Sequence, residues 1–228
     1  MYIAKNVEPA SWIPSRLHPF AQDVGSIIPE GFAAYARVFH PPHRMTSAGT
    51  FVPVRWTDIA AANDRTIAAE MQRLDMSAEP ARFSPSGEEL WQQQPETGSI
   101  PREIAVRLAA ILPSHTRTPE LCWFAVWEGF GDLRIRETGG PMFSVPGRDL
   151  FLLHGTVDDV LTTLSEVDWI YRSPNLWWPD DRAWCVATEI DFNWSYVGGS
   201  ASCIQQVLDD SELEALPTTP EQGNSMEK

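Results

Sequence analysis

The sequence predicts an α+β fold, a single domain in which a mainly antiparallel sheet has flanking helices. The chain has 228 residues, of which 43% are hydrophobic and 11% aromatic, so it can bury a sizeable core. Short apolar runs separated by turn-forming residues indicate strands joined as hairpins, and segments of helical periodicity interrupt them. We expect residues 1–25 to form an irregular N-terminal arm, residues 26–216 the domain, and residues 217–228 a disordered tail.

The N-terminal half contains few segments of clear periodicity. Repeated prolines in residues 1–25 indicate either an arm that lies across the domain or a partly ordered leader, with Trp12 as its anchor. Two short strands are expected, which can pair as a hairpin with a long connection: Phe32–His40 and Phe51–Trp56. The segments expected after them are a short helix capped by Thr57, a helix over Thr66–Asp75 and a surface loop over residues 76–100.

The C-terminal half has the stronger signals. Pro101 opens a helix, because Ser99 precedes it as a cap and Ile104, Leu108 and Ile111 recur at helical spacing. The run Leu121–Trp127 is apolar on both faces, which is typical of a buried central strand. The other expected elements are a hairpin of Pro141–Val145 with Asp149–Thr156, an amphipathic helix over Asp158–Val167, strands over Ala183–Asp191 and Trp194–Val197, and a helix over Ser200–Leu208 capped by Ser200.

Acidic residues are concentrated toward the C-terminal end. Residues 156–228 hold 14 acidic and 3 basic side chains, whereas residues 1–155 hold 17 and 14. This negative potential repels phosphate backbones, so we expect no nucleic-acid binding; it attracts cations or basic protein surfaces, unless it serves only solubility. No apolar run is long enough for a membrane helix, and MYIAKNVEPASW has no signal-peptide core. With three widely spaced cysteines, these features predict a cytoplasmic protein without a membrane partner.

The segment Ser173–Ser200 combines four tryptophans, an acidic turn and a carboxylate pair. Side chains of neighbouring residues in an extended segment point to opposite sides. We therefore expect at least one of Trp177 and Trp178 to reach the surface or to line a cleft. Arg182 can hold a substrate carboxylate or stack on one of these rings, or it can only neutralise nearby carboxylates. The candidate binding residues are Trp177, Trp178, Asp180, Asp181, Arg182 and Tyr196.

A carboxylate pair ends the expected strand Ala183–Asp191. Glu189 and Asp191 would share one face of the strand, with Cα atoms about 6.5–7 Å apart, and Trp184 would lie buried on the other face. Such a pair suits a cation, an arginine clamp, or a general acid and base. The alternative is a strand that leaves the core into solvent, with both carboxylates solvated or one of them capping a turn. Asp181, in the preceding turn, is expected to be dispensable for stability.

The histidines provide one further catalytic candidate. His154 can act as a general base near Glu128 if their strands are adjacent, or it can be a hydrogen-bonded core residue. Two prolines separate His40 from His43 and rule out a helix that would aim both rings at one metal ion, so no metal site is predicted. The chain has no nucleophile-elbow or phosphate-binding motif, so neither covalent catalysis nor a cofactor is expected.

Several sequence blocks occur in a fixed order between about residues 27 and 217. They are GSIPREI, LCWFAVWEGFG, LFLLHG, SPNLWWPDDRAWCVATEID, SYVGGS and LEALP. In these blocks the chain resembles a family of uncharacterised bacterial proteins, and this resemblance implies no activity. The alternation of short strands and helices and the acidic balance are also faintly similar to those of SUKH immunity proteins, which neutralise toxins. No SUKH motif aligns, so no residue role follows from that similarity.

Two functional hypotheses follow from the sequence. In the first, the protein is a noncatalytic, immunity-like interaction module that binds a basic protein partner through its acidic, tryptophan-rich C-terminal third. In the second, it is a small-molecule enzyme or binder with the Glu189/Asp191 pair in a pocket. The residues expected to line that pocket are Trp177, Trp178, Trp184 and Tyr196. The position of the carboxylates distinguishes them: a deep apolar cleft favours the second, and exposed tryptophans on a flat acidic face favour the first.

Overall fold

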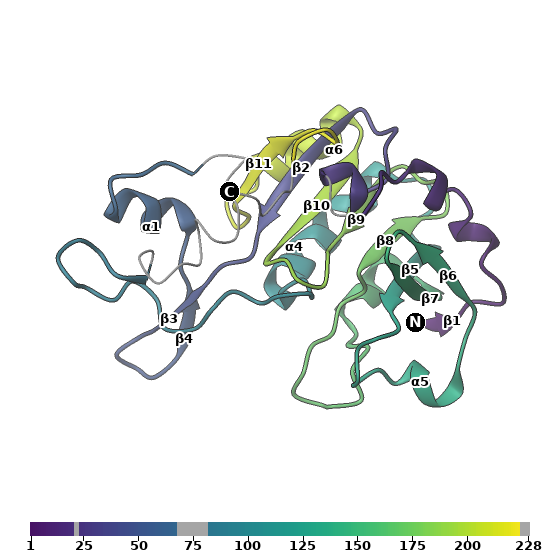
Figure 1. Ribbon diagram of the computed structural model, residues 1–228, viewed down its shortest axis with the longest axis horizontal. Helices are drawn as coiled ribbons and strands as arrows, with labels where there is room; N and C mark the ends of the chain where they lie inside the picture. Colours follow the sequence, from purple (N-terminus) through teal and green to yellow (C-terminus); the bar gives the residue numbers. More distant parts are fainter. Residues whose placement is uncertain (21–22, 68–81, 224–228) are drawn as a thin grey trace.

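The computed structural model describes residues 1–20, 23–67 and 82–223. Among them, nine strands form one sheet in which every pairing is antiparallel, in the order β1-β7-β5-β8-β9-β10-β2-β11, with β6 also paired to β7 (Figure 1). The strands of this sheet are β1 (Tyr2–Ile3), β2 (Ala34–Phe39), β5 (Cys122–Trp127), β6 (Met142–Val145), β7 (Arg148–Gly155), β8 (Leu176–Pro179), β9 (Cys185–Ala187), β10 (Trp194–Gly199) and β11 (Ala215–Thr218).

Helices are fewer than strands in the described ranges. The α-helices are α1 (Trp56–Ala62), α4 (Arg102–Ile111), α5 (Ile135–Thr138) and α6 (Ala201–Asp209). The 3-10 helices are η1 (Glu8–Ala10), η2 (Pro14–Arg16), η3 (Val24–Ser26), η4 (Leu112–His115) and η5 (Val157–Leu161). The predicted α+β class with a mainly antiparallel sheet is confirmed, and no helix in these ranges is long and apolar enough to cross a bilayer.

The two faces of the sheet carry separate hydrophobic cores. Helices α4 and α6 and segment η5 cover one face, where Trp177 and Trp184 are buried. The N-terminal arm covers the other face, where Trp178, Trp194 and Tyr196 are buried. In Figure 1 the purple arm passes in front of the strands and α4 lies behind them. Both faces are covered, which explains why the central strands are apolar on both sides.

The N-terminal arm lies across the sheet and is anchored by Trp12, which is one of the two arrangements that the sequence left open. Trp12 is buried, and its ring packs edge-on against Trp178 at a centroid distance of 6.0 Å. Ile13 and Ile28 are fully buried beside it. The arm thus supplies the apolar layer that this face of the sheet needs, and short 3-10 turns suffice because the prolines preclude a longer helix.

The predicted disordered tail is wrong for residues 217–223. Strand β11 adds to the edge of β2, with Pro217 and Thr218 in register with Ala36 and Tyr35. Beyond it, Gln222 accepts a backbone hydrogen bond of 2.9 Å from Val24 of the arm. The open edge of β2 provides backbone partners that composition alone does not reveal. Residues 224–228 of the predicted tail lie outside the described residues.

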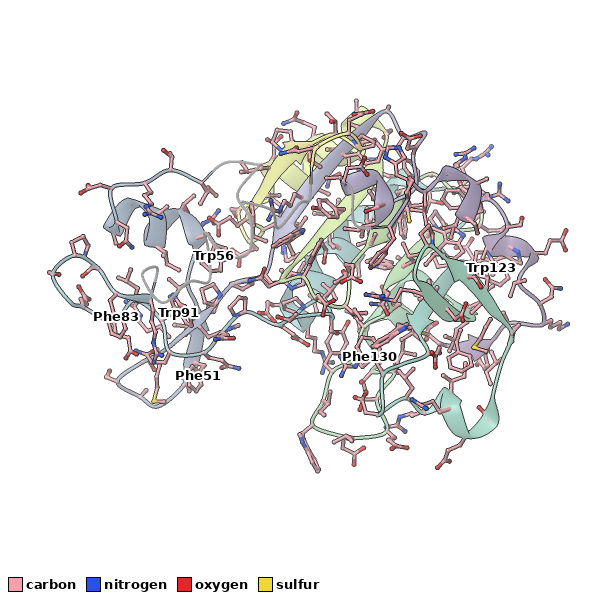
Figure 2. The ribbon with its side chains drawn as sticks, viewed as in Figure 1. Phe51, Trp56, Phe83, Trp91, Trp123 and Phe130 are labelled. Carbon is pink, nitrogen blue, oxygen red and sulfur yellow. The ribbon has the colours of Figure 1, made fainter. Side chains whose placement is uncertain are left out.

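Strand pairing near residue 50 differs from the expected hairpin. The segment β4 (Phe51–Pro53) pairs with β3 (His43–Met45), not with β2, because Pro41-Pro42 end β2 and the chain resumes as a separate strand. These two strands and α1 lie to one side of the main sheet (Figure 1). Figure 2 shows Phe51, Trp56, Phe83 and Trp91 gathered in this part of the molecule. The helix expected over Thr66–Asp75 lies largely outside the described residues.

Helix caps also involve residues distant in the sequence. Thr57 is not the cap of α1, because the carboxylate of Glu214 accepts hydrogen bonds from the backbone N–H groups of Trp56 and Thr57 at 2.6 and 2.7 Å. The hydroxyl of Ser99 does not cap α4; it donates to Ser173 at 3.1 Å. Ser200 caps α6 as predicted and accepts from the Cys203 N–H at 3.2 Å.

Two predicted elements of the C-terminal third are shorter than expected. In place of the helix expected over Asp158–Val167, the structure has only the 3-10 turn η5. The hydroxyl of Thr163 donates to the Ile170 carbonyl and accepts from the N–H groups of Ser165 and Arg172. These side-chain hydrogen bonds replace the backbone bonds of a longer helix. The strand over Ala183–Asp191 is limited to β9. A turn follows it, in which the Phe192 N–H bonds the Glu189 carbonyl at 3.2 Å.

Candidate functional site

A cavity of about 530 Å³ lies between the N-terminal arm, the β6–β7 hairpin and the turn after β9. Its size falls within the range of about 300–1,000 Å³ that is usual for small-molecule sites. The wall is mainly apolar, and the arm, β7 and β8 all contribute to it; among the lining residues are Leu17, Ile27, Trp127, Val145, Leu150 and Leu176. The lining also includes a small charged group, which is the polar feature such a site needs for orientation.

That charged group consists of Arg148, Glu189 and Asp191, all of which line the cavity. Arg148 Nη2 donates to Glu189 Oε1 at 2.7 Å and lies 3.8 Å from Asp191 Oδ2. The backbone N–H of Asp191 donates to Glu189 Oε2 at 2.6 Å. The two carboxylates lie in a turn and not on a strand, and Glu189 both accepts from the backbone of that turn and pairs with Arg148.

The two carboxylates differ in how far they are engaged. The side chain of Glu189 is 13% exposed, and both of its oxygens accept hydrogen bonds. The side chain of Asp191 is 76% exposed, and its distance from Arg148 is beyond hydrogen-bond range. Asp191 thus stands at the rim of the cavity with acceptor oxygens open to solvent, whereas Glu189 holds the arginine in place.

Aromatic rings fix the guanidinium of Arg148. Its central carbon lies 5.0 Å from the ring centroid of Phe20 and 5.6 Å from that of Trp127, both of which line the cavity. Its Nη1 donates to the Gly147 carbonyl at 2.9 Å, and its Nε is buried with no hydrogen-bond partner among the described residues. The arginine is therefore held as part of the wall.

Asn175 joins the strands that carry the cavity. Its side-chain oxygen accepts from the Trp127 N–H at 2.9 Å, and its amide nitrogen donates to the carbonyls of Thr188 and Gly98 at 3.1 and 3.4 Å. All of its bonds are to backbone, so it positions Trp127 and the turn after β9. At Gly98, φ is +76° and an added Cβ would overlap the Ile190 carbonyl, which requires glycine there.

A buried hydrogen-bond chain runs from Thr188 to His40. Thr188 Oγ1 and Ser195 Oγ are 2.6 Å apart, Ser195 Oγ and His40 Nε2 are 2.8 Å apart, and His40 Nδ1 donates to the Glu96 carbonyl at 2.8 Å. Because that carbonyl can only accept, Nδ1 carries the proton and Nε2 accepts from Ser195. Burial lowers the pKa of His40 to about 4. His40 and Ser195 are fully buried, so this pair supports the fold and does not reach a substrate.

Trp177 and Trp178 are not at the surface or in the cavity. They point to opposite sides of β8, as expected, but each is fully buried because the two faces of the sheet are both covered. Trp177 packs edge-on against Trp184 at 5.1 Å. Tyr196 is also buried, and its hydroxyl accepts from Trp194 Nε1 at 2.9 Å. The expectation that one of the neighbouring tryptophans would be exposed is wrong.

The acidic turn serves the fold. Asp181 accepts hydrogen bonds from the Thr116 hydroxyl at 2.7 Å and the Arg117 N–H at 2.9 Å, and hydrogen bonds of this kind hold its pKa below the ordinary value despite desolvation. Asp180 accepts from Trp123 Nε1 at 2.9 Å. Arg182 stacks on Trp12, at 5.5 Å from the ring, and not on Trp177 or Trp178. None of the three lines the cavity.

His154 is separated from Glu128. His154 is paired with Trp123 across β7 and β5, whereas Glu128 follows the opposite end of β5, about 16 Å away at the usual strand rise. The imidazole packs between the rings of Trp123 and Tyr2, at 5.6 and 5.8 Å. The proposed general base near Glu128 is therefore contradicted, because the antiparallel register places the two residues at opposite ends of the strands.

Thiol and metal chemistry find no support in the described part of the chain. Cys122, Cys185 and Cys203 are buried, and burial raises the pKa of the Cys122 and Cys203 thiols to about 12. Within those residues, no group of three histidine, cysteine or carboxylate side chains can hold a metal ion. His40 faces Ser195, whereas His43 lies 3.3 Å from Glu103.

Sequence reasoning missed the central residue of the cavity, Arg148. It is the first residue of β7, directly after the hairpin turn, where an arginine gives no signal that it will meet a carboxylate 41 residues later. Phe20 and Trp127 were likewise not assigned to a site. Trp169 was also missed: it is 87% exposed, in a turn closed by the Ile170 N–H to Val167 carbonyl bond of 3.0 Å. A search of protein-family models, curated proteins and solved structures found no match to this chain.

Proposed function

We propose that the protein binds a small, largely apolar molecule in the cavity beside Arg148. The observation that carries this proposal is the cavity itself, which combines a small-molecule volume and an apolar wall with one convergent charged group. Of the two hypotheses that the sequence left open, this is the second, with Trp127 in the wall in place of the predicted Trp177, Trp178, Trp184 and Tyr196. The burial of Trp177 and Trp178 removes the aromatic anchors on which the first depended.

Binding without catalysis is the simpler form of this proposal. A general acid and base pair needs two carboxyl groups that can exchange protons with a substrate. Both oxygens of Glu189 accept hydrogen bonds from Arg148 and from the backbone, which leaves only Asp191 free. We therefore assign Glu189 to holding the wall and Asp191 to contact with the ligand.

Nile red, a neutral apolar dye, tests the proposal directly. Val145 is half-buried and lines the cavity, so Val145→Trp should fill part of it. Val106 is 44% exposed on α4, on the opposite side of the sheet, so Val106→Trp is a matched control. We expect saturable dye binding that Val145→Trp weakens at least about tenfold and Val106→Trp leaves unchanged. Equal binding by the two variants would contradict the proposal, provided that both melt near the wild-type temperature.

One observation favours a second candidate, binding of a basic protein. Trp169 is exposed directly after Asp168 and three residues after Glu166, in the acidic third of the chain. Its turn is held in place, since Arg134 Nε donates to the Ser165 carbonyl at 2.6 Å and Arg134 Nη2 lies 3.5 Å from Asp168. An aromatic side chain presented on an ordered acidic turn is suited to a protein interface.

Affinity purification from native lysate distinguishes this candidate. A partner bound through the turn should be lost with Trp169→Ser and retained with Tyr2→Ser, which removes another exposed aromatic ring. Recovery of the same proteins with both variants would exclude Trp169 as the anchor.

A further inference from the structure

We infer that the ligand of the cavity is a cationic amphiphile, an apolar body that carries an amine or a similar positively charged group bound by Asp191 at the rim. This inference rests on the proposed function, because it names the chemical class that the same cavity accepts. Three features carry it: the charge of the polar group, the engagement of Arg148 and the exposure of Asp191.

The charged residues of the cavity favour a ligand that is a cation. The positive charge of Arg148 is outweighed by the two negative charges of Glu189 and Asp191, so these three residues together carry one net negative charge. A cationic ligand would neutralise this excess beside an apolar wall, whereas an anionic ligand would double it. The field of the whole chain acts in the same direction, since its formal net charge is −14.

Arg148 is not arranged as an anion receptor. An arginine that binds a carboxylate presents two parallel N–H groups to it. Here Nη2 is bonded to Glu189, Nη1 is bonded to the Gly147 carbonyl, and Nε is buried. Phe20 and Trp127 flank the guanidinium and hold it against the wall. An anionic ligand would therefore compete with Glu189 for Nη2.

Asp191 is placed to bind a cation. Its side chain lines the cavity and is 76% exposed, so a ligand can reach its oxygens without displacing a protein hydrogen bond. Its backbone is fixed by the bond to Glu189, which limits the entropy lost when a ligand binds. An apolar body would then lie against Leu17, Ile27 and Leu176, with its charged end at the mouth of the cavity.

Three probes with the same phenylbutyl body and different head groups test the inference: 4-phenylbutylamine, 4-phenylbutanol and 5-phenylpentanoate, titrated calorimetrically into the full chain near neutral pH. We expect the amine to bind about fivefold more tightly than the alcohol, as for a solvent-accessible ion pair, and the carboxylate to bind most weakly. The preference for the amine should shrink in high salt.

Asp191→Asn supplies the decisive variant. It should abolish the preference for the amine and leave the affinity for the alcohol unchanged. Asp158→Asn, an identical charge change on η5 at the far end of β7, should leave both affinities unchanged. Thermal unfolding of each variant verifies the fold.

Two outcomes overturn the inference in distinguishable ways. Equal affinity for amine and alcohol, or tighter binding of the carboxylate, refutes the ligand class and leaves cavity binding intact. Failure of all three probes, together with equal Nile red binding by Val145→Trp and Val106→Trp, refutes the proposed function as well.

Discussion

Protonation of His40 is expected to contribute strongly to acid unfolding of this protein. The imidazole is fully buried, with Nδ1 bonded to the Glu96 carbonyl and Nε2 bonded to Ser195, and burial lowers its pKa from 6.5 to about 4. The unfolded chain therefore binds a proton more readily than the folded one. The neutral ring contributes its full stability above about pH 6.5, and this contribution is lost as the pH falls from 6.5 toward 4.

The size of the effect follows from the two pKa values. Linkage between protonation and folding gives a loss of about 2 kcal/mol on lowering the pH to about 5, and about 3 kcal/mol well below pH 4. Such a loss is large compared with the 5–15 kcal/mol that stabilise a typical domain. Carboxylates with lowered pKa values, such as Asp181 and Asp210, add to acid sensitivity at lower pH.

Urea unfolding of His40→Gln and of a control isolates the contribution of His40. His115 lies on η4, where it contacts Gln206, so His115→Gln makes the same chemical change outside the core. We expect His40→Gln to be less stable than the wild type near neutral pH but to lose about 2 kcal/mol less on acidification to about pH 5. His115→Gln should follow the wild type.

A wild-type pH dependence in His40→Gln would refute the reasoning. A direct check is the NMR titration of the His40 ring in the native protein. A midpoint above about pH 6 would show that the imidazole is not held neutral by burial.

Three other predictions concern the C-terminal third and the arm. Trp184→Ala should lower the free energy of unfolding by about 3–5 kcal/mol, because the ring is fully buried and its Nε1 donates to the Leu112 carbonyl at 3.0 Å; a native-like midpoint in urea would contradict this. Asp181→Ala, which the sequence alone suggested to be harmless, should lower the free energy of unfolding by about 2 kcal/mol, because a largely buried carboxylate loses three hydrogen bonds. Asp180→Ala should lower it clearly less. Equal melting temperatures of the two variants would refute this difference. The imidazole of His18 bridges Asp23 and Glu30 at 2.7 and 2.6 Å, and these hydrogen bonds raise the pKa of His18. The bridge therefore stabilises the fold fully below about pH 6.5, and this contribution is lost as the pH rises through the raised pKa. His18→Gln should therefore lower the melting temperature near pH 6 more than near pH 9, and a pH-independent difference would exclude the ionised bridge.

Much of the fold could be predicted because its signals are local. The strand at Leu121–Trp127 follows from an apolar run, the helix after Pro101 from its spacing, and the cap at Ser200 from its position before a periodic segment. The failures occurred where distant groups compete with local preference. Glu214 caps α1 from 157 residues away, and the edge of β2 orders the supposed tail.

The candidate site could be predicted only in part. Glu189 and Asp191 were recognised as a pair because two carboxylates two residues apart must lie close together. Arg148 was not recognised, since its partner lies 41 residues further along the chain. At least one of Trp177 and Trp178 was expected at the surface or in a cleft, because local alternation places them on opposite faces and no local signal shows that both faces are covered.

By itself, the sequence determined the fold class, the central strands and the presence of a carboxylate pair, because hydrophobic periodicity and turn chemistry act over a few residues. Only the tertiary structure decided what those residues do. It buried both neighbouring tryptophans, moved His154 away from Glu128, and placed Arg148 between the carboxylates and two aromatic rings at the wall of a cavity. The physical reason is that strand order and register determine which distant side chains meet, and neither is encoded in any short segment.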